Sequence, residues 1–343
     1  MCIRDRELID WYEAKKQMEA SRKEKGRYLI GVGMACGSHG TSMFPFMPDI
    51  TGITIKMNED GTIVFTTGTS DMGNGSVTTQ CMLISEVLGI PLDHIAYIKT
   101  DTDAAMSDLG AYASRGTYTS GHAAVKTAQI MRDKIAVLAA ELLDTTTDNL
   151  DFHDDAVWCV DIHRKFVSMK EIAVHAREKH QEDLSCSYMF HSEAGPMSSG
   201  AHFAKVQVDT VTGGIKVLEY AAVHDVGRVV NPMGITGQLE GGISMGLGYA
   251  LCEEMKLDST GRNQTSSFKK YHILNVKEMP KLSVDFLDSE EETGPYGAKS
   301  IGECAVVPVA PAIANAVSNA VGRQFYKLPI RPEDVLEALS LVK

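Results

Sequence analysis

Residues 203–223 read FAKVQVDTVTGGIKVLEYAAV, and this stretch decides the fold class. Two β-rich runs, Phe203–Val208 and Ile215–Val223, flank the turn residues Thr212-Gly213-Gly214. Branched and aromatic residues on both sides of a glycine turn are typical of a β-hairpin. Strands joined by a hairpin are antiparallel, so the sequence predicts a mixed architecture and not a succession of βαβ units.

Further hairpins and helices are predicted outward from this stretch. A D-G turn at 58–61 predicts a hairpin of Gly52–Met57 with Thr62–Thr67, and another is predicted near Leu150–Val160. A single strand is predicted at Ile95–Lys99. Helices are predicted at Glu7–Lys25, Val77–Leu88, Tyr118–Leu143, Met169–His180, Gly237–Cys252 and Val309–Val321, with a last short helix that has Pro332 in its first turn.

This order of elements predicts an α+β fold of two subdomains, with hairpin-rich sheets and packed helices. The boundary is expected near Ser185–Ser199, which places subdomain A at 28–190 and subdomain B at 191–343. Residues 1–27 are expected to form a polar leader helix, of which Met1–Arg6 could be non-native. Because this helix begins without a cap, the chain is expected to be a fragment or one subunit of a split protein.

Composition argues against several classes of protein. Of the 343 residues, 44% are hydrophobic and 23% are charged, which excludes a disordered chain. The 45 acidic and 33 basic residues give a net charge of −12 without a basic stripe, which argues against nucleic-acid binding. No apolar signal core follows Met1–Arg6, and the charge-poor run Cys304–Gly322 contains two prolines, so neither secretion nor a membrane span is predicted.

The cysteines indicate a reducing compartment. There are seven, they are scattered along the chain, and they form no C-x-x-C pair. We therefore expect free thiols in the cytoplasm, and we expect no disulfide framework, structural zinc site or iron–sulfur cluster held by this chain alone. No metal ligand is assigned to any residue.

Two glycine-rich loops precede predicted helices. Gly68–Gly75 (GTSDMGNG) would let a ligand approach the backbone, and the following helix start suits an anion, although the loop could be a plain strand-to-helix turn. Gly110–Thr117 (GAYASRGT) offers small side chains and hydroxyls to a phosphate or polar cofactor, unless Ser114 or Thr117 only caps the helix. We expect the backbone N–H groups of both loops to point at one anion-sized hollow.

The third loop follows the hairpin at 203–223. His224 and Asp225 are adjacent on a strand, so their side chains point to opposite faces and are not expected to form a catalytic pair. Gln238 lies at the start of a helix of small residues, where its amide can both donate to and accept from a heterocycle.

The fourth loop, Gly294–Cys304 (GPYGAKSIGEC), carries Glu303 into a run with almost no other charge up to Arg323. A carboxylate beside an apolar segment is costly unless it is paired or functional. Two interpretations remain open. Glu303 is either a general base whose pKa is set by its surroundings or the partner of Lys299 in a salt bridge.

Taken in this order, the four loops resemble one family, the molybdenum hydroxylases, which include xanthine dehydrogenase and aldehyde oxidase. The resemblance is to the second molybdopterin-binding region of the large subunit and extends from about Tyr28 to Ala338. It is carried by GTSDMGNG, by ASRGTYTSG, by VHDVGRVVNP with GQLEGG, and by GPYGAKSIGE with PAIANAV. One such motif is weak evidence, whereas four in the same order are specific.

The resemblance implies roles for the matching residues. Glu303 matches the family's catalytic glutamate, a general base that activates the oxygen nucleophile. The residues that match cofactor contacts are Met72, Gly73, Asn74, Ala113, Ser114, Gly116 and Gln238. The implied cofactor is a molybdopterin, either plain or as the cytosine dinucleotide. The implied reaction is oxidation of a purine, an N-heterocycle or an aldehyde with oxygen taken from water.

The chain also departs from the family pattern. Asn74 replaces a common Gln, and Cys304 replaces a common Pro. The family's first molybdopterin-binding half is missing, and the 2Fe–2S and FAD modules are expected on partner subunits, so the isolated chain is expected to be inactive. Two alternatives are a non-catalytic half that acts only in subunit assembly and a metal-dependent hydrolase. The sequence contains no H-x-x-x-H or H-x-H spacing, which argues against the hydrolase.

Overall fold

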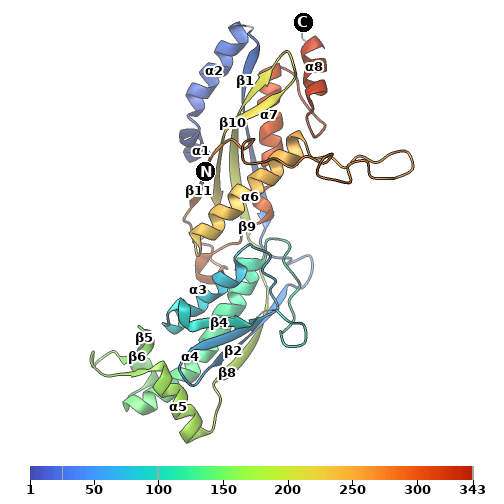
Figure 1. The fold of residues 1–343 in the computed structure, drawn as a ribbon. Helices are drawn as coiled ribbons and strands as arrows, with labels where there is room; N and C mark the ends of the chain where they lie inside the picture. Colours follow the sequence, from blue (N-terminus) through green and yellow to red (C-terminus); the bar gives the residue numbers. More distant parts are fainter. Residues whose placement is uncertain (25, 99, 342–343) are drawn as a thin grey trace.

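The computed structural model describes residues 1–24, 26–98 and 100–341. These residues form an elongated molecule of two lobes placed end to end (Figure 1). The upper lobe in the figure comprises residues 1–40 and 197–341 and holds both ends of the chain, whereas the lower lobe comprises residues 50–191. The lower lobe is therefore an insertion between two strands of the upper one.

A four-stranded sheet forms the centre of the upper lobe, in the order β1-β9-β10-β11. β1 and β9 are antiparallel, with Tyr28 opposite Asp209 and Gly40 opposite Met197. β10 is antiparallel to β9 and parallel to β11. The strands are β1 (Tyr28–Gly40), β9 (Met197–Asp209), β10 (Ile215–Asp225) and β11 (Lys281–Leu287).

Helices cover both faces of this sheet. Val206 and Tyr220 are buried on the face covered by α6 and α7, and Val335 of α8 belongs to the same core. On the other face Phe203 packs against the N-terminal helices, where its ring and that of Trp11 are perpendicular at a centroid distance of 4.9 Å. The helices are α1 (Cys2–Leu8), α2 (Trp11–Glu24), α6 (Pro232–Leu251), α7 (Val309–Val321) and α8 (Pro332–Leu341).

Helix α7 lies directly on β1 because β1 carries glycines. A Cβ atom on Gly33 would lie 2.2 Å from the backbone nitrogen of Ala316 and 2.4 Å from the carbonyl oxygen of Ala312. In the described part of the chain, one helical segment, Glu303–Val321, is long and apolar enough to cross a membrane, but 67% of it is buried inside the protein. Its contacts with β1 and β9 make it a core element of the upper lobe.

The lower lobe contains a sheet in the order β4-β3-β2-β8 and a small sheet in the order β5-β6-β7. Its core joins Ile55 and Phe65 of the larger sheet to Leu88 of α3 and Met131 of α4. The elements are β2 (Ile50–Met57), β3 (Ile63–Thr67), α3 (Ser76–Leu88), β4 (Ile95–Ile98), α4 (Gly121–Leu143), β5 (Leu150–His153), β6 (Ala156–Cys159), β7 (Phe166–Ser168), α5 (Met169–His180) and β8 (Ser185–His191).

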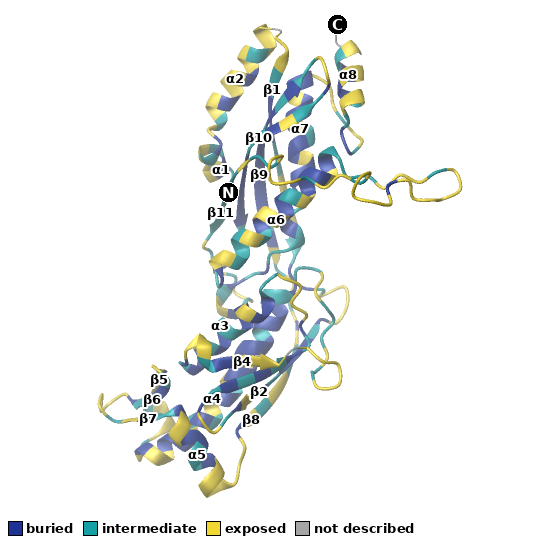
Figure 2. Cartoon of the chain, in the orientation of Figure 1, coloured by how far each residue is buried: buried dark blue, intermediate teal, exposed yellow. Residues whose placement is uncertain are grey.

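The two chain crossings between the lobes lie side by side. The backbone N–H and the hydroxyl of Thr41 both donate to the carbonyl of Pro196, each at 2.9 Å. Buried residues follow the sheets and the inward helix faces, whereas residues 252–280 form a largely exposed arm that projects from the upper lobe (Figure 2). The lower lobe is thus tied to the upper one at a single junction.

The structure confirms the predicted α+β class, and all three predicted hairpins form. Helices α5 and α7 have the predicted bounds. Helix α6 begins at Pro232, five residues before the predicted start, because the Asn231 side chain caps it by accepting from the N–H of Gly234 at 3.1 Å. Lys25 and Lys99, at the ends of a predicted helix and a predicted strand, lie outside the described residues.

Four strands differ from the sequence-based prediction. Residues 28–40 are predicted in subdomain A, but as β1 they pair with β9 in the upper lobe. Residues 185–191 are predicted as a boundary, but as β8 they complete the lower sheet beside β2. β7 and β11 have no predicted counterpart. The expected leader helix divides into α1 and α2, with Asp10 between them in a left-handed conformation (φ 46°).

Candidate active site

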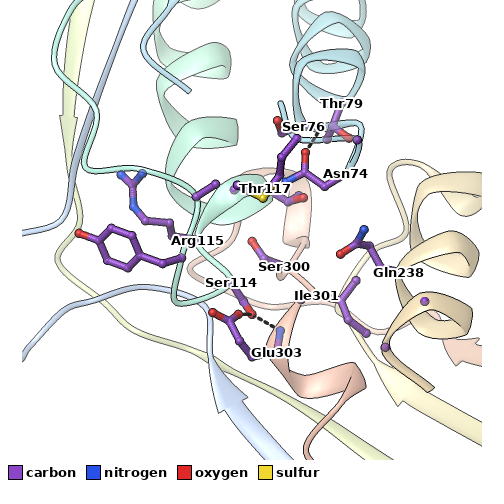
Figure 3. Close-up of a pocket in the computed structure, with 18 of the residues that line it drawn as sticks. Asn74, Ser76, Thr79, Ser114, Arg115, Thr117, Gln238, Ser300, Ile301 and Glu303 are labelled. Atoms are coloured by element: carbon purple, nitrogen blue, oxygen red, sulfur yellow. Dashed lines mark hydrogen bonds between the residues drawn. The ribbon is translucent and has the colours of Figure 1, made fainter. Parts of the chain in front are cut away.

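A cavity of about 450 Å³ opens where the two lobes meet (Figure 3). Loops at 69–76 and 110–117 line it from the lower lobe, and residues 237–245 in the middle of α6 and residues 300–306 line it from the upper lobe. Most of the predicted site residues line this one cavity: Met72, Gly73, Asn74, Ser114, Gly116, Gln238 and Glu303. Ala113, also predicted, is not among the lining residues. The structure thus brings together four loops that are far apart in sequence.

The loop at 68–75 is folded around Asp71. The Asp71 carboxylate accepts hydrogen bonds from the N–H groups of Gly73 at 2.9 Å, Gly75 at 3.3 Å and Val77 at 3.3 Å. The N–H of Ser76 donates to the Asn74 side chain at 3.2 Å. The sequence predicts that these N–H groups point at an anion. That prediction is wrong for this loop, because its N–H groups form hydrogen bonds with its own side chains.

A side chain beside this loop is left without a partner. The Ser76 hydroxyl is buried, lines the cavity, and finds no hydrogen-bond partner among the described residues. A buried polar atom without a partner is costly, and a polar ligand in the cavity would relieve that cost. The cavity is therefore chemically suited to a polar cofactor through its side chains.

The loop at 110–117 has an unusual backbone. Ala113 and Ser114 are consecutive non-glycine residues in the left-handed region, with φ of 52° and 47°. Each such residue typically costs about 1–3 kcal/mol, and the cost is tolerated only where the surroundings hold the backbone in place. The next residue, Arg115, provides that support.

Arg115 is the largest fully buried side chain of the described residues and anchors the loop from behind. Its guanidinium donates to Asp49 at 2.6 Å, to both carboxylate oxygens of Asp108 at 2.9 and 3.0 Å, and to the Thr51 hydroxyl at 2.7 Å. It also donates to the backbone carbonyl of Gly110 at 3.1 Å. This network was not predicted, although an arginine within a loop of small residues was its signal in the sequence.

Glu303 reaches the cavity from the upper lobe, at the start of the short helix η5 (Glu303–Ala305). The Ser114 hydroxyl donates to a Glu303 carboxylate oxygen and accepts the backbone N–H of Glu303 at 3.0 Å. Figure 3 shows the two side chains facing each other across the junction. A Cβ atom on Gly302 would lie 2.9 Å from the Ser114 oxygen, so the glycine leaves room for this contact.

Lys299 does not pair with Glu303. Its ammonium lies 3.0 Å from Asp225, so the salt bridge considered from the sequence forms with a different carboxylate. Partial burial raises the pKa of Glu303, but hydrogen bonds from Ser114 and from backbone N–H groups, together with His39 nearby, outweigh it. The pKa of Glu303 therefore lies below its ordinary value, and the group is a carboxylate at neutral pH.

Helix α6 presents Gln238 to the same cavity and is held close to Glu303. A Cβ atom on Gly242 would lie 2.6 Å from the Cβ of Ala305, so α6 and η5 are in direct contact. His224 points away from the cavity into the core, where it contacts His202 at 2.7 Å and burial lowers its pKa to about 4. His224 and Asp225 therefore have different partners, because Asp225 contacts Lys299.

Comparison with known proteins agrees with this geometry. The family model for the molybdopterin cofactor-binding domain matches residues 4–280, which is most of the chain. The chain belongs to the molybdenum hydroxylase family. Within this family, it is 31% identical over 341 residues to the xanthine dehydrogenase molybdenum-binding subunit of Escherichia coli O157:H7, covering 98% of this chain and 45% of that protein.

Other molybdenum hydroxylases show the same pattern of similarity. The carbon monoxide dehydrogenase large chain of Afipia carboxidovorans is 29% identical over 319 residues, covering 90% of this chain and 39% of that one. The solved carbon monoxide dehydrogenase from Oligotropha carboxidovorans superimposes with a TM-score of 0.91 at 25% identity, covering 98% of this chain and 45% of that one. Quinoline 2-oxidoreductase from Pseudomonas putida 86 has the same fold, with a TM-score of 0.91 at 23% identity, covering 98% of this chain and 44% of that one.

The chain spans less than half the length of these relatives. It corresponds to a molybdopterin-binding domain of their molybdenum-binding or large subunits, and the remaining part of such a subunit has no counterpart in these 343 residues.

Proposed function

We propose that this chain is the C-terminal molybdopterin-binding part of a molybdenum hydroxylase. In the complete enzyme it would oxidise a purine, an N-heterocycle or an aldehyde with water as the source of oxygen. The observation that carries the proposal is the placement of Glu303, an ionised carboxylate held by Ser114 at a cavity that four family motifs line.

The cavity fits a molybdopterin on the evidence of its own atoms. The unpartnered Ser76 hydroxyl, together with the side chains of Asn74, Ser114 and Gln238, provides donors and acceptors along its walls. When bound, the cofactor would supply the redox chemistry of the reaction. Met72, Gly73, Ala113 and Gly116 are proposed as its remaining contacts, and the cofactor is proposed in either its plain or its cytosine dinucleotide form.

Glu303 is proposed as the general base. It would accept a proton from the water-derived oxygen as that oxygen attacks the substrate carbon. Ser114 would keep the carboxylate oriented and ionised, because its hydroxyl hydrogen bond favours the charged form. The left-handed backbone at Ala113 and Ser114, held by Arg115, would fix that hydroxyl in place.

The missing part of the enzyme defines the proposed partners. The relatives are about twice as long as this chain, so an N-terminal molybdopterin-binding half would complete the cavity. Iron–sulfur (2Fe–2S) and FAD subunits would carry electrons away, and all would assemble in the cytoplasm. The alternative is a non-catalytic half that only supports subunit assembly.

Co-expression of the chain with such an N-terminal half tests the proposal. The purified complex is washed with chelator, its molybdenum content is measured, and turnover is assayed with xanthine, an N-heterocycle and an aldehyde. Molybdenum together with turnover that requires Glu303 supports the proposal. A complex that assembles without molybdenum supports the assembly role instead.

A further inference from the structure

A cluster of three potential metal ligands lies in the lower lobe, at the opposite end of α4 from the candidate active site. Glu141 is in the last turn of α4, and His175 and His180 are on α5. The ligand atoms of these three side chains all lie within 4.8 Å of one another. The sequence assigned no metal ligand to them because the two histidines are five residues apart and the glutamate is on another helix.

The two imidazoles converge on the same carboxylate oxygen. Nε2 of His180 lies 2.8 Å from Oε2 of Glu141, and Nε2 of His175 lies 3.2 Å from it. In a tetrahedral zinc site with bonds of about 2.0–2.2 Å, neighbouring ligand atoms are separated by about 3.3 Å. The two nitrogen-to-oxygen distances observed here, 2.8 and 3.2 Å, are therefore close to the distance between ligand atoms in a zinc site.

Hydrogen bonding within the described structure satisfies His180 and Glu141 but leaves one nitrogen of this cluster without a partner. Nε2 of His175 is buried, and despite its distance of 3.2 Å from Glu141 it has no hydrogen bond with acceptable geometry in the described structure. A buried ring nitrogen without a partner is uncommon. A metal ion bound by both imidazoles and the carboxylate would use this nitrogen as a ligand.

The charged neighbour of the cluster is exposed to solvent. Lys179 contacts the other carboxylate oxygen of Glu141, but its side chain is 57% exposed and can turn into solvent. His180 and Glu141 are also partly exposed, so water can complete the coordination sphere. Two neutral imidazoles and one carboxylate form a ligand set that zinc commonly accepts.

We propose that Glu141, His175 and His180 bind one divalent transition-metal ion of the zinc type. The ion would link the C-terminal end of α4 to α5. Because α5 follows the small sheet and α4 begins next to the Ser114 loop, the ion would stabilise the packing of these two parts of the lower lobe. The site is separate from the molybdopterin cavity, and neither proposal depends on the other.

The test measures Zn²⁺ binding to the 343-residue chain by calorimetry after chelator treatment. His175→Ala and His180→Ala are compared with His272→Ala, which removes a histidine that pairs with Glu278 at 2.9 Å but has no second imidazole nearby. We expect one Zn²⁺ per chain. Loss of a direct ligand should weaken binding by more than the roughly 10–100-fold typical of losing an outer-shell partner. His272→Ala should bind as the wild type does.

Co²⁺ serves as a second probe on the unmodified chain. Visible absorption bands typical of tetrahedral Co²⁺ with nitrogen ligands would support the site without relying on a variant that folds. Absence of a stoichiometric site on the wild-type chain, or equal affinity in His175→Ala and His272→Ala, would overturn the proposal. Molybdenum content in the co-expressed complex reports on the other site alone.

Discussion

The Ser114 hydroxyl donates to the Glu303 carboxylate, joining two residues that are 189 positions apart in the sequence. Ser114 belongs to the lower lobe and Glu303 to the upper lobe, so this contact bridges the junction between them. It also fixes the ionised carboxylate at the cavity wall.

Glu303→Gln should nearly abolish turnover in the complete enzyme while leaving molybdenum bound. Glutamine keeps the size and the hydrogen bond with Ser114 but cannot take a proton. Loss of a general base typically lowers the rate by about 10²–10⁴-fold, and we expect the upper end. Steady-state kinetics and metal analysis of the co-expressed complex provide the measurement. Near-normal turnover with intact metal would rule out the assignment.

Ser114→Ala should move the acid limb of the pH–rate profile to higher pH. The base is active when deprotonated, and the pKa of Glu303 lies below its ordinary value of 4.5, so wild-type activity should fall only as the pH drops through that lower pKa. Without the hydroxyl, the effect of burial dominates and the pKa rises. The measurement is kcat/KM against pH. An unshifted acid limb in a variant that retains molybdenum would contradict the role given to Ser114.

Arg115→Met should destabilise the protein strongly. It leaves Asp49 and Asp108 buried without their cation, and removing one partner of a buried ion pair typically costs about 3–5 kcal/mol. Urea unfolding followed by circular dichroism measures the loss. Arg27→Met is the matched control, because it breaks the exposed pair with Asp209 and should change the midpoint little. Equal effects of the two substitutions would argue against an anchoring role for Arg115.

Gly33→Ala should destabilise the upper lobe, because the new Cβ would collide with backbone atoms of α7 that have no rotamer to change. Overpacking of this kind typically costs about 1–3 kcal/mol or more. Gly237→Ala is the control, since its Cβ would meet nothing within 4 Å. Alanine in a helix is favoured over glycine by about 0.5–1 kcal/mol, so this variant should unfold slightly later. Thermal unfolding of both variants gives the comparison.

An element can be predicted from the sequence when the residues that determine it are close together in the chain. The hairpin at 203–223 and helices α5 and α7 were predicted because turn residues and apolar periodicity act within a few positions. β1 was not predicted as a strand because glycine has a low strand propensity. These glycines allow the backbone of α7 to lie against β1. That requirement comes from a helix almost 300 residues later, so no local pattern carries it.

The same contrast holds for the candidate site. Eight site residues were predicted from four motifs, and seven of them, all except Ala113, line one cavity. Which carboxylate Lys299 pairs with depends on how two loops approach each other, and the sequence left that open. The Arg115 network and the Glu141 cluster also join separate segments, and each single residue in them looks ordinary in the sequence.

The insertion of the lower lobe between β1 and β9 has a consequence for biosynthesis. Residues 50–191 are continuous, so the lower lobe can complete its sheets as soon as it leaves the ribosome. β1 emerges before this lobe, yet its partner β9 emerges only after it, and α7, which covers β1, emerges later still. During synthesis the glycine-rich strand therefore stays without its partner strand until the lower lobe has been made, and an unpaired strand of this kind is open to chaperones and misassembly.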